Sequence, residues 1–280
     1  MPKLPEWFRS SIGKKQAELK LKNTLGKDIP NCICHEAKCP NRAECFSKGQ
    51  LTFLILGKIC TRNCTFCSVD KGTPLPVDKS EYKNILDTIS KLKLKFVVLT
   101  SPTRDDLPDG GASTYAFIVK KIKESFPVVK IEVLIPDFKG DLNALKTVID
   151  SGPDVINHNL ETVPSFYDKV RPQADFEQSL NLLQKVKEIN PNILTKTGVM
   201  LGFGENNHEL IGTFKAIATS KIDILTMGQY LKPKRINLDV VKYYSPDEFK
   251  DLKEKAEKIG IKHVFSGPLV RSSYLAEEIF

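Results

Sequence analysis

Three cysteines with one compact spacing are the residues of this chain best suited to chemistry. They stand as Cys60-Thr-Arg-Asn-Cys64-Thr-Phe-Cys67, directly after the apolar run 51–57. Three thiolates can bind three irons of a [4Fe–4S] cluster and leave the fourth iron without a protein ligand. A catalytic metal centre needs such an open position, which the amine and carboxylate of a methionine could fill. A zinc site is the alternative, since Cys64 and Cys67 have a zinc-type spacing and other cysteines could complete four ligands.

A second cysteine array precedes the first one. Cys34, Cys39 and Cys45 form a C-x4-C-x5-C pattern, which suggests a second cluster. Cys32 is either its fourth ligand or a small buried apolar residue, and we favour the buried residue because Cys-x-Cys neighbours rarely reach different corners of one cube. All seven cysteines lie between positions 32 and 67, and an odd number argues against a disulfide framework.

Composition sets broad limits on the protein. A chain of 280 residues with 41% hydrophobic residues suits one large α/β barrel or two small domains. No apolar run approaches the roughly 20 residues needed to cross a bilayer, and the opening lacks a secretory pattern, so we expect a cytoplasmic protein. The net charge of +8 is compatible with nucleic acid, anionic lipid or an acidic protein partner. Much of the lysine falls on amphipathic helices, and the segment 14–27 is the better candidate for a docking surface.

The rest of the chain alternates short apolar runs with amphipathic stretches. Expected strands are 51–57, 96–101, 130–136, 154–160, 194–202 and 222–229; expected helices lie near 80–93, 113–126, 141–150, 176–190, 206–220 and 246–259; a shorter run, KHVFSG, follows. Six strand–helix units favour a parallel sheet. No glycine-rich fingerprint follows the first strand, which argues against a dinucleotide-binding fold. Polar residues instead gather after the ends of several strands, where barrel enzymes place their active sites. We therefore predict an α/β fold with a partial (β/α)6 barrel.

Two motifs resemble the radical S-adenosylmethionine superfamily. The first is the C-x3-C-x-aromatic-C pattern after the first strand. The second, Gly198-Val-Met200-Leu-Gly202-Phe-Gly-Glu205, is similar to the G-x-I-x-G-x-x-E element that packs against the adenine in that superfamily. The resemblance implies that S-adenosylmethionine is a cofactor.

Within that superfamily the chain resembles the lipoyl synthase family over about residues 30–275. The segments that carry this resemblance are CHEAKCPNRAEC, CTRNCTFCSV, DDLPDGGA, VLIPDF, NHNLETV, VRPQADFEQSL and KTGVMLGFGE. The segment GPLVRSSY is similar to the family's R-S-S-Y element, which implies that Ser273, or failing that Ser272, is the fourth ligand of the auxiliary cluster. The implied organisation is an extension with auxiliary ligands (1–50), the barrel (51–265) and a C-terminal segment closing over it (266–280).

The resemblance also implies the reaction and its partners. Two [4Fe–4S] clusters would serve radical insertion of sulfur at carbons 6 and 8 of a protein-bound octanoyl-lysine, the auxiliary cluster supplying the sulfur. The expected partners are an octanoylated lipoyl domain or glycine cleavage H protein and a ferredoxin or flavodoxin, with no nucleic acid and no membrane. The alternatives are a transfer RNA methylthiotransferase, for which the chain lacks room for an RNA-binding module, and an electron carrier, which would need eight ligands from seven cysteines.

Several further residues are candidates for binding S-adenosylmethionine. Strand alternation puts Asn157, Asn159 and Glu161 on one face and a structural His158 on the other. Asp109 and Gly110 bind the cofactor's amine or form an ordinary Asp–Gly turn, and Arg171 holds a carboxylate or makes a surface ion pair. Gln229 ends the sixth strand, where it could face the substrate. The full set of expected cofactor-binding residues is Phe66, Asp109, Gly110, Asn157, Asn159, Glu161, Arg171, Gly198, Met200 and Gln229.

Overall fold

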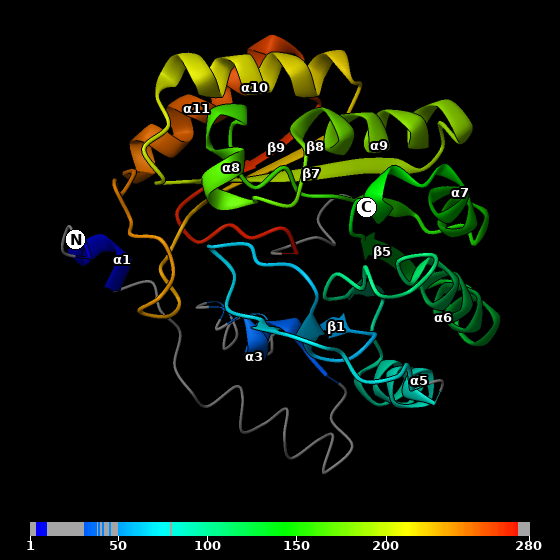
Figure 1. Cartoon of the computed structure of the whole chain (residues 1–280). Coiled ribbons are helices and arrows are strands. Elements are labelled where there is room, and N and C mark those ends of the chain that lie inside the picture. The colour runs from blue at the N-terminus through cyan, green and yellow to red at the C-terminus, as the bar shows by residue number, and fades with distance from the viewer. Residues whose placement is uncertain are drawn as a thin grey trace. The chain divides into compact units, whose positions relative to one another are not determined.

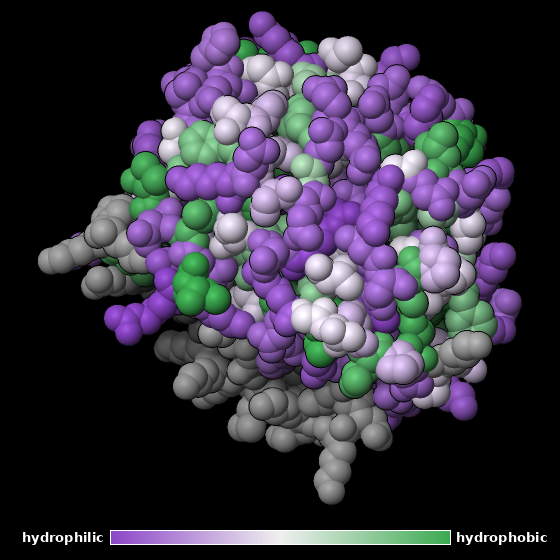
Figure 2. All heavy atoms as spheres, in the orientation of Figure 1, coloured by the Kyte–Doolittle hydropathy of each residue, from purple (hydrophilic) through white to green (hydrophobic). Residues whose placement is uncertain are grey.

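The computed structural model describes residues 4–9, 31–37, 39, 41, 45, 50–78 and 80–273. The basic segment 14–27, expected as a docking surface, lies outside the described residues. In the part of the chain that the model describes, no helix is both long and apolar enough to span a membrane. Figure 2 shows polar and charged side chains over most of the face in view, with apolar residues in small separate patches.

The fold is α/β, as predicted, with a parallel sheet in the strand order β1-β4-β5-β6-β7-β8-β9. All six expected strands are present, and the short run KHVFSG adds a seventh, β9 (His263–Ser266), which pairs in parallel with β8. Contacts divide the chain into two compact units: residues 1–12, 63–68 and 156–272 form the first, and residues 13–62, 69–155 and 273–280 form the second. The predicted division at residues 50 and 265 stays a prediction.

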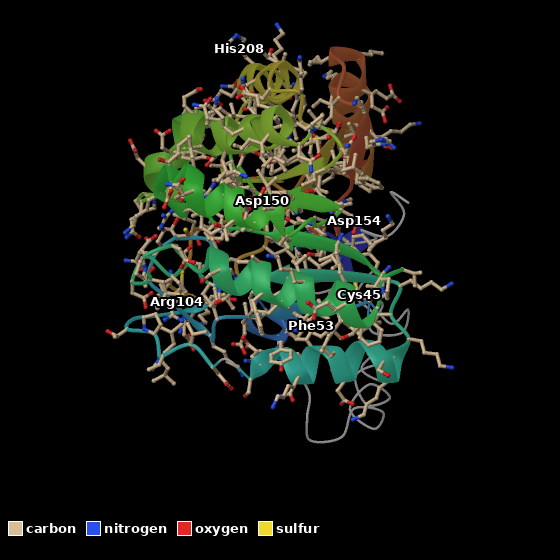
Figure 3. All side chains as sticks on the ribbon, turned by 90° about the vertical axis from the view of Figure 1, so that its right-hand side faces the viewer. Cys45, Phe53, Arg104, Asp150, Asp154 and His208 are labelled. Atoms are coloured by element: carbon tan, nitrogen blue, oxygen red, sulfur yellow. The ribbon has the colours of Figure 1, made fainter. Side chains whose placement is uncertain are left out.

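The second unit contains the strands β1, β4 and β5 with the helices that connect them. Its elements are α3 (Ile33–Glu36), β1 (Thr52–Leu54), β2 (Ile59–Cys60), β3 (Asp70–Lys71), α5 (Glu81–Leu92), β4 (Phe96–Thr100), α6 (Ala112–Ser125), β5 (Lys130–Leu134), the 3-10 turn η1 (Phe138–Gly140) and α7 (Leu142–Asp150). The helix α6 packs against both α5 and α7 (Figure 1). Arg104, in the loop that follows β4, lies at the opposite end of this unit from Asp154 (Figure 3).

The first unit contains β7, β8 and β9, with three long helices on one side of them (Figure 1). Its elements are α1 (Glu6–Arg9), the 3-10 turn η2 (Pro164–Phe166), α8 (Tyr167–Val170), α9 (Phe176–Ile189), β7 (Leu194–Leu201), α10 (Asn207–Thr219), β8 (Ile224–Gln229), α11 (Pro246–Ile259) and β9; β6 (Val155–Asn157) begins at the last residue of the other unit. The long helices start where the sequence supplies caps. Asn206 with Glu209, and Ser245 with Glu248, form capping boxes that satisfy the first amides of α10 and α11.

A buried carboxylate joins the amino ends of the strands in the first unit. Asp223, just before β8, accepts hydrogen bonds from the Thr195 amide at 3.0 Å and from the ammonium groups of Lys187 at 2.9 Å and Lys262 at 3.0 Å. Burial opposes its charge, but these donors together lower the pKa of Asp223 below its usual value. The carboxylate therefore fixes this end of the sheet, and the opposite end carries the predicted site residues.

Candidate functional site

The first cysteine of the cluster motif lies in a short strand of its own. Cys60 ends β2, which pairs in parallel with β3, and its carbonyl accepts from the Gly72 amide at 3.1 Å. The Cys60 Sγ atom accepts from the Arg62 amide at 3.4 Å. Thr61 donates through both its amide and its hydroxyl to the Thr103 carbonyl, each at 3.0 Å. Backbone bonds thus fix the position of Cys60 and direct an N–H group at its sulfur.

A buried arginine holds this same loop against two neighbouring loops of the second unit. The Arg62 guanidinium donates to Asp105 from Nε at 2.7 Å and from Nη2 at 3.1 Å. It also donates to Asp137 from Nη1 and Nη2, both at 2.6 Å. Burial opposes the charge, yet the bonds to Asp137 and Asp105 raise the pKa of Arg62 above its usual value. Arg62, the middle one of the three residues between Cys60 and Cys64, is therefore held by two carboxylates.

The remaining two cysteines lie in the short segment 63–68 of the first unit. The Cys67 amide donates to the Cys64 carbonyl at 3.3 Å, which closes a tight turn between them. Thr65 donates from its amide to the Val170 carbonyl at 3.0 Å and from its hydroxyl to the Lys169 carbonyl at 2.7 Å. From the other side, Asn237 Nδ2 donates to the carbonyls of Thr65 at 2.8 Å and Cys67 at 3.1 Å. These bonds hold the backbone around both cysteines in one conformation.

An apolar cluster adjoins this segment. Its buried members are Val170, Phe203, Tyr230 and Val240, and the partly buried Phe66, Phe166, Met200, Leu238 and Tyr243 pack against them. Phe203 and Tyr230 stack with ring centroids 4.4 Å apart. Two of the expected cofactor-binding residues, Phe66 and Met200, therefore belong to one aromatic cluster, although they stand more than 130 positions apart in the sequence.

The end of β6 brings two more predicted residues into contact. Asn159 Nδ2 donates to Glu161 Oε1 at 3.0 Å, as expected for side chains on one face. Burial raises the pKa of Glu161, while Arg171 and Asn159 act in the opposite direction. The His158 Nε2 atom lies 3.1 Å from the Ser179 hydroxyl, so the prediction of a structural His158 is confirmed. Asn157 is fully buried at the last position of β6.

Arg171 is buried, so the surface ion pair considered for it is wrong. Its Nη1 atom donates to the Asn159 carbonyl at 2.7 Å and to the Tyr167 hydroxyl at 3.2 Å. Arg171 thus supports the backbone that carries Asn159 and Glu161, while its role toward a cofactor carboxylate stays a prediction.

Glycines on β7 and β8 make room for the C-terminal segment. A Cβ atom on Gly228 would lie 2.0 Å from the Val270 carbonyl, and one on Gly198 would lie 2.8 Å from both Asn159 Oδ1 and Thr226 Oγ1. Through this space the Ser272 hydroxyl donates to Asn159 Oδ1 at 2.9 Å. The sequence points to Gly198 only through its resemblance to an adenine-binding element, and it contains no sign of the approach at Gly228.

Glu205 closes the glycine-rich end of β7. Its carboxylate accepts from the amides of Gly202 at 2.6 Å, Phe203 at 2.9 Å and Gly204 at 3.0 Å. The last residue of the superfamily-like motif therefore shapes the turn that carries Phe203. Its observed contacts are with the protein's own backbone.

Three other predicted residues are engaged within the protein. Asp109 accepts from the amides of Gly111 at 2.9 Å and Ser113 at 2.7 Å at the start of α6, which is the Asp–Gly turn considered as its alternative role. Gly110 has φ +60, a conformation that favours glycine there. The fully buried Gln229 amide donates to the carbonyls of Leu201, Tyr230 and Lys242 and accepts from the Tyr244 amide. Ligand binding by Asp109 or Gln229 stays a prediction that these contacts do not favour.

The auxiliary cysteines are placed by α3 and its surroundings in the second unit. Hydrogen bonds with the Cys32 and Cys39 thiols, together with burial, raise the pKa of the Cys34 thiol well above its usual value, so Cys34 interacts with both of those cysteines. Cys32 is buried, as expected, and forms a β-bridge with Phe53. Cys45 is buried as well. Ser273 belongs to this same unit, whereas Ser272 belongs to the other.

The donors suit iron–sulfur clusters by their chemistry. All seven cysteines are free thiols, and Cys60, Cys64 and Cys67 are each partly exposed. Among the described residues no group of three or more Cys, His, Asp or Glu side chains is close enough to hold one metal ion. Thiolates are the usual protein ligands of iron–sulfur clusters, so both cysteine arrays are chemically suited to hold one.

Comparison with known proteins shows the superfamily to which this chain belongs. The family model described as the radical SAM superfamily matches residues 54–217. Two solved structures of low sequence identity share the fold: methylornithine synthase (14% identity, TM-score 0.57, covering 91% of this chain and 79% of that one) and the [FeFe]-hydrogenase maturase HydG (12% identity, TM-score 0.60, covering 91% and 62%). This chain therefore has the radical SAM fold, a partial barrel.

Relatives that align over nearly the whole chain identify the family within this superfamily. The lipoyl synthase of Caldanaerobacter subterraneus is 48% identical over 98% of this chain and 95% of its own length. Those of Alkaliphilus metalliredigens (50%, covering 98% and 94%) and Haemophilus influenzae strain Rd (47%, covering 98% and 87%) are comparably similar. The chain belongs to the lipoyl synthase family. Neither the methylthiotransferase nor the electron-carrier alternative receives support from these relatives.

Proposed function

We propose that this protein inserts two sulfur atoms, at carbons 6 and 8, into an octanoyl chain carried on a lysine of a lipoyl domain or H protein. Membership of the lipoyl synthase family, at about half identity over nearly the whole chain, carries this proposal. Cys60, Cys64 and Cys67 would hold the cluster that, once reduced, supplies the electron to cleave S-adenosylmethionine into methionine and a 5′-deoxyadenosyl radical. An unactivated C–H bond is too strong for acid–base chemistry, which is why a cofactor must carry this step.

The protein's own residues would bind and orient the cofactor. Phe66 and Met200, in the cluster around Phe203 and Tyr230, offer the flat apolar surface that an adenine ring needs. Asn159 and Glu161, in contact with each other, offer hydrogen-bonding groups for the ribose or the methionine. Arg171 would keep both in place through its bond to the Asn159 carbonyl. Excluding water with this aromatic cluster would also protect a carbon radical from side reactions.

Sulfur would come from a second [4Fe–4S] cluster held by Cys34, Cys39, Cys45 and Ser273. Two observations support Ser273 over Ser272 as the fourth ligand. Ser273 shares a compact unit with the three cysteines, and the Ser272 hydroxyl already donates to Asn159. A hydroxyl oxygen is a weaker ligand for iron than a thiolate, so it would release its iron readily when sulfur is removed.

The decisive experiment separates radical formation from sulfur insertion. The protein is reconstituted anaerobically with iron and sulfide, then supplied with dithionite, S-adenosylmethionine and an octanoyl-lysine peptide. We expect 5′-deoxyadenosine and a dithiolated peptide, both measured by mass spectrometry. If the wild-type protein forms neither product, the proposal is wrong.

Two variants test the division of labour between the clusters. Cys39→Ala should still release 5′-deoxyadenosine but give no thiolated peptide. Cys64→Ala should lose both products. If Cys39→Ala inserts sulfur as the wild type does, the second array is not the sulfur source.

A further inference from the structure

A tight turn after β8 presents an isoleucine to solvent. Lys234, Arg235, Ile236 and Asn237 form this 234–237 turn, which is closed by a bond from the Asn237 amide to the Lys234 carbonyl at 3.1 Å. The Lys234 amide donates in return to Asn237 Oδ1 at 3.1 Å. Arg235 and Ile236 occupy the two corner positions, and Ile236 is 88% exposed. Singly exposed apolar side chains are common on protein surfaces, so the exposure of Ile236 counts here only together with the rigidity, position and charge of its turn.

The exposure of Ile236 does not come from a loosely held loop. Asn237 Nδ2 is bound to the carbonyls of Thr65 and Cys67, and the Leu238 amide donates to the Thr65 carbonyl at 3.3 Å. On the following residues, the Tyr230 hydroxyl donates to the Leu238 carbonyl at 2.8 Å, and Lys232 pairs with Asp239 at 2.7 Å. The turn is therefore preorganised, which lowers the entropy lost when a partner binds.

The anchor also fixes where the turn lies. Asn237 is hydrogen-bonded to the backbone of the segment 63–68, which carries Cys64 and Cys67. Ile236 and Arg235 immediately precede Asn237 in the chain, so both lie near that segment. A substrate chain attached to a carrier protein can reach these cysteines only if the carrier rests close to them. In Figure 1 the turn belongs to the orange trace that leads from β8 to α11.

The charge at the turn indicates the chemistry of the partner. The stretch 231–242 contains four basic residues, Lys232, Lys234, Arg235 and Lys242, and one acidic residue, Asp239. Two of these cations are paired within the chain, Lys232 with Asp239 and Lys242 with Glu248, whereas the exposed Arg235 stands beside Ile236. An exposed isoleucine next to an arginine is complementary to an apolar patch that borders a carboxylate.

We infer that the 234–237 turn is the docking element for the acidic surface of the octanoylated carrier domain, with Ile236 as the apolar contact and Arg235 as the steering charge. This inference rests on the proposed function, because it assumes that the acyl chain arrives on a protein. It adds a specific surface by which the enzyme distinguishes a carrier domain from a free acyl-lysine.

The test compares a whole carrier with a short peptide that cannot reach the turn. Ile236→Asp, Arg235→Glu and the wild type are assayed anaerobically with dithionite, on an octanoylated lipoyl domain and on an octanoyl-lysine tripeptide. Val128→Asp is the matched control: Val128 is equally exposed, at 88%, but precedes β5 in the second unit. We expect Ile236→Asp to raise KM for the carrier at least about tenfold, the loss typical of a central apolar contact, and to leave KM for the tripeptide within about twofold.

Arg235→Glu should weaken use of the carrier most at low salt, because a steering charge acts through screened electrostatics. Val128→Asp should match the wild type on both substrates. An unchanged carrier KM in Ile236→Asp, or an equal rise for the tripeptide, overturns the inference. If activity in Ile236→Asp falls only when a reductant protein replaces dithionite, the turn binds the electron donor instead and the carrier inference is wrong. Failure of the wild type on both substrates refutes the proposed function itself.

Discussion

Replacing Arg62 with methionine tests whether the buried clamp on the cysteine loop is as important as its geometry indicates. The substitution keeps a long side chain but removes four hydrogen bonds to Asp105 and Asp137. Asp137 is only 1% exposed, so its carboxylate would be left buried without the guanidinium. Breaking a buried ion pair in this way costs about 3–5 kcal/mol, because the remaining charge is uncompensated.

The measurement is urea unfolding of the metal-free protein under reducing, anaerobic conditions, followed by circular dichroism. We expect Arg62→Met to lower the free energy of unfolding by about 3–5 kcal/mol with an unchanged denaturant slope. The double variant Arg62→Met with Asp137→Asn should regain part of that loss, because asparagine leaves no buried charge. Arg235→Met, which replaces an exposed arginine, should change the free energy by less than about 0.5 kcal/mol.

A loss below about 1 kcal/mol in Arg62→Met would refute this reasoning, since it would mean that water or other groups satisfy both carboxylates at little cost. A second measurement, the iron content after reconstitution, connects the clamp to the site. The Arg62 amide donates to Cys60 Sγ, so a loop released from Asp105 and Asp137 should bind less iron. Equal iron content in both proteins would separate the clamp from cluster binding.

Three further predictions concern other parts of the first unit. Asp223→Asn should lower the free energy of unfolding by about 1–3 kcal/mol at pH 7, because it weakens the charged hydrogen bonds of a buried carboxylate. The folded state lowers the pKa of Asp223, so its carboxylate stabilises the protein above the unfolded-state pKa near 3.9, and this stabilisation is lost as the pH falls through the folded-state pKa. The difference in free energy of unfolding between Asp223→Asn and the wild type should therefore shrink in acid. A difference that stays constant with pH would contradict this. Gly198→Ala should abolish binding of S-adenosylmethionine, measured by equilibrium dialysis, because the added Cβ would lie 2.8 Å from Asn159 and Thr226. The control is Gly212→Ala, inside α10 with open space around it. This control should bind S-adenosylmethionine normally and stabilise the protein by about 0.5–1 kcal/mol. Glu205→Gln should weaken the turn at Gly202–Gly204 and lower the melting temperature by several degrees, and an unchanged melting temperature would show that the three amides do not depend on the carboxylate charge.

Periodic apolar runs and caps made most of the fold predictable. Each long helix lies within one or two residues of its expected range, because signals such as Ser245 with Glu248 act over one turn of chain. The strand ends were less predictable: the first strand stops at Leu54, and Leu56 and Gly57 soon follow with positive φ angles of 65 and 87. The run KHVFSG was too short to identify as a strand until pairing with β8 stabilised it.

Candidate site residues can be chosen from the sequence where the chemistry depends on residue type and local spacing, as for the cysteines, whose ligand roles stay predictions. The site was not predictable where a contact joins distant positions. Arg62 meets carboxylates 43 and 75 positions away, and Asn237 binds carbonyls 172 and 170 positions away. The one available signal for Arg62 was that Asp105 and Asp137 each follow a strand, where polar side chains of parallel strands meet. For Gln229 the strand-end position predicts a ligand contact, whereas the contacts in the structure are bonds between its amide and the neighbouring backbone; its role toward a ligand stays a prediction.

The path of the chain through its two compact units limits how the protein can be divided. In the described part of the chain the backbone passes from one unit to the other at residues 62/63, 68/69, 155/156 and 272/273. No single cut can therefore release either unit as one continuous piece, and a gene fragment for one half would omit stretches of that half. The six residues 63–68 are the shortest excursion, and they bring Cys64 and Cys67 with them. A chimera of two relatives joined at a single point should therefore contain units of mixed origin and lose function. A functional chimera should need every segment of one unit exchanged together.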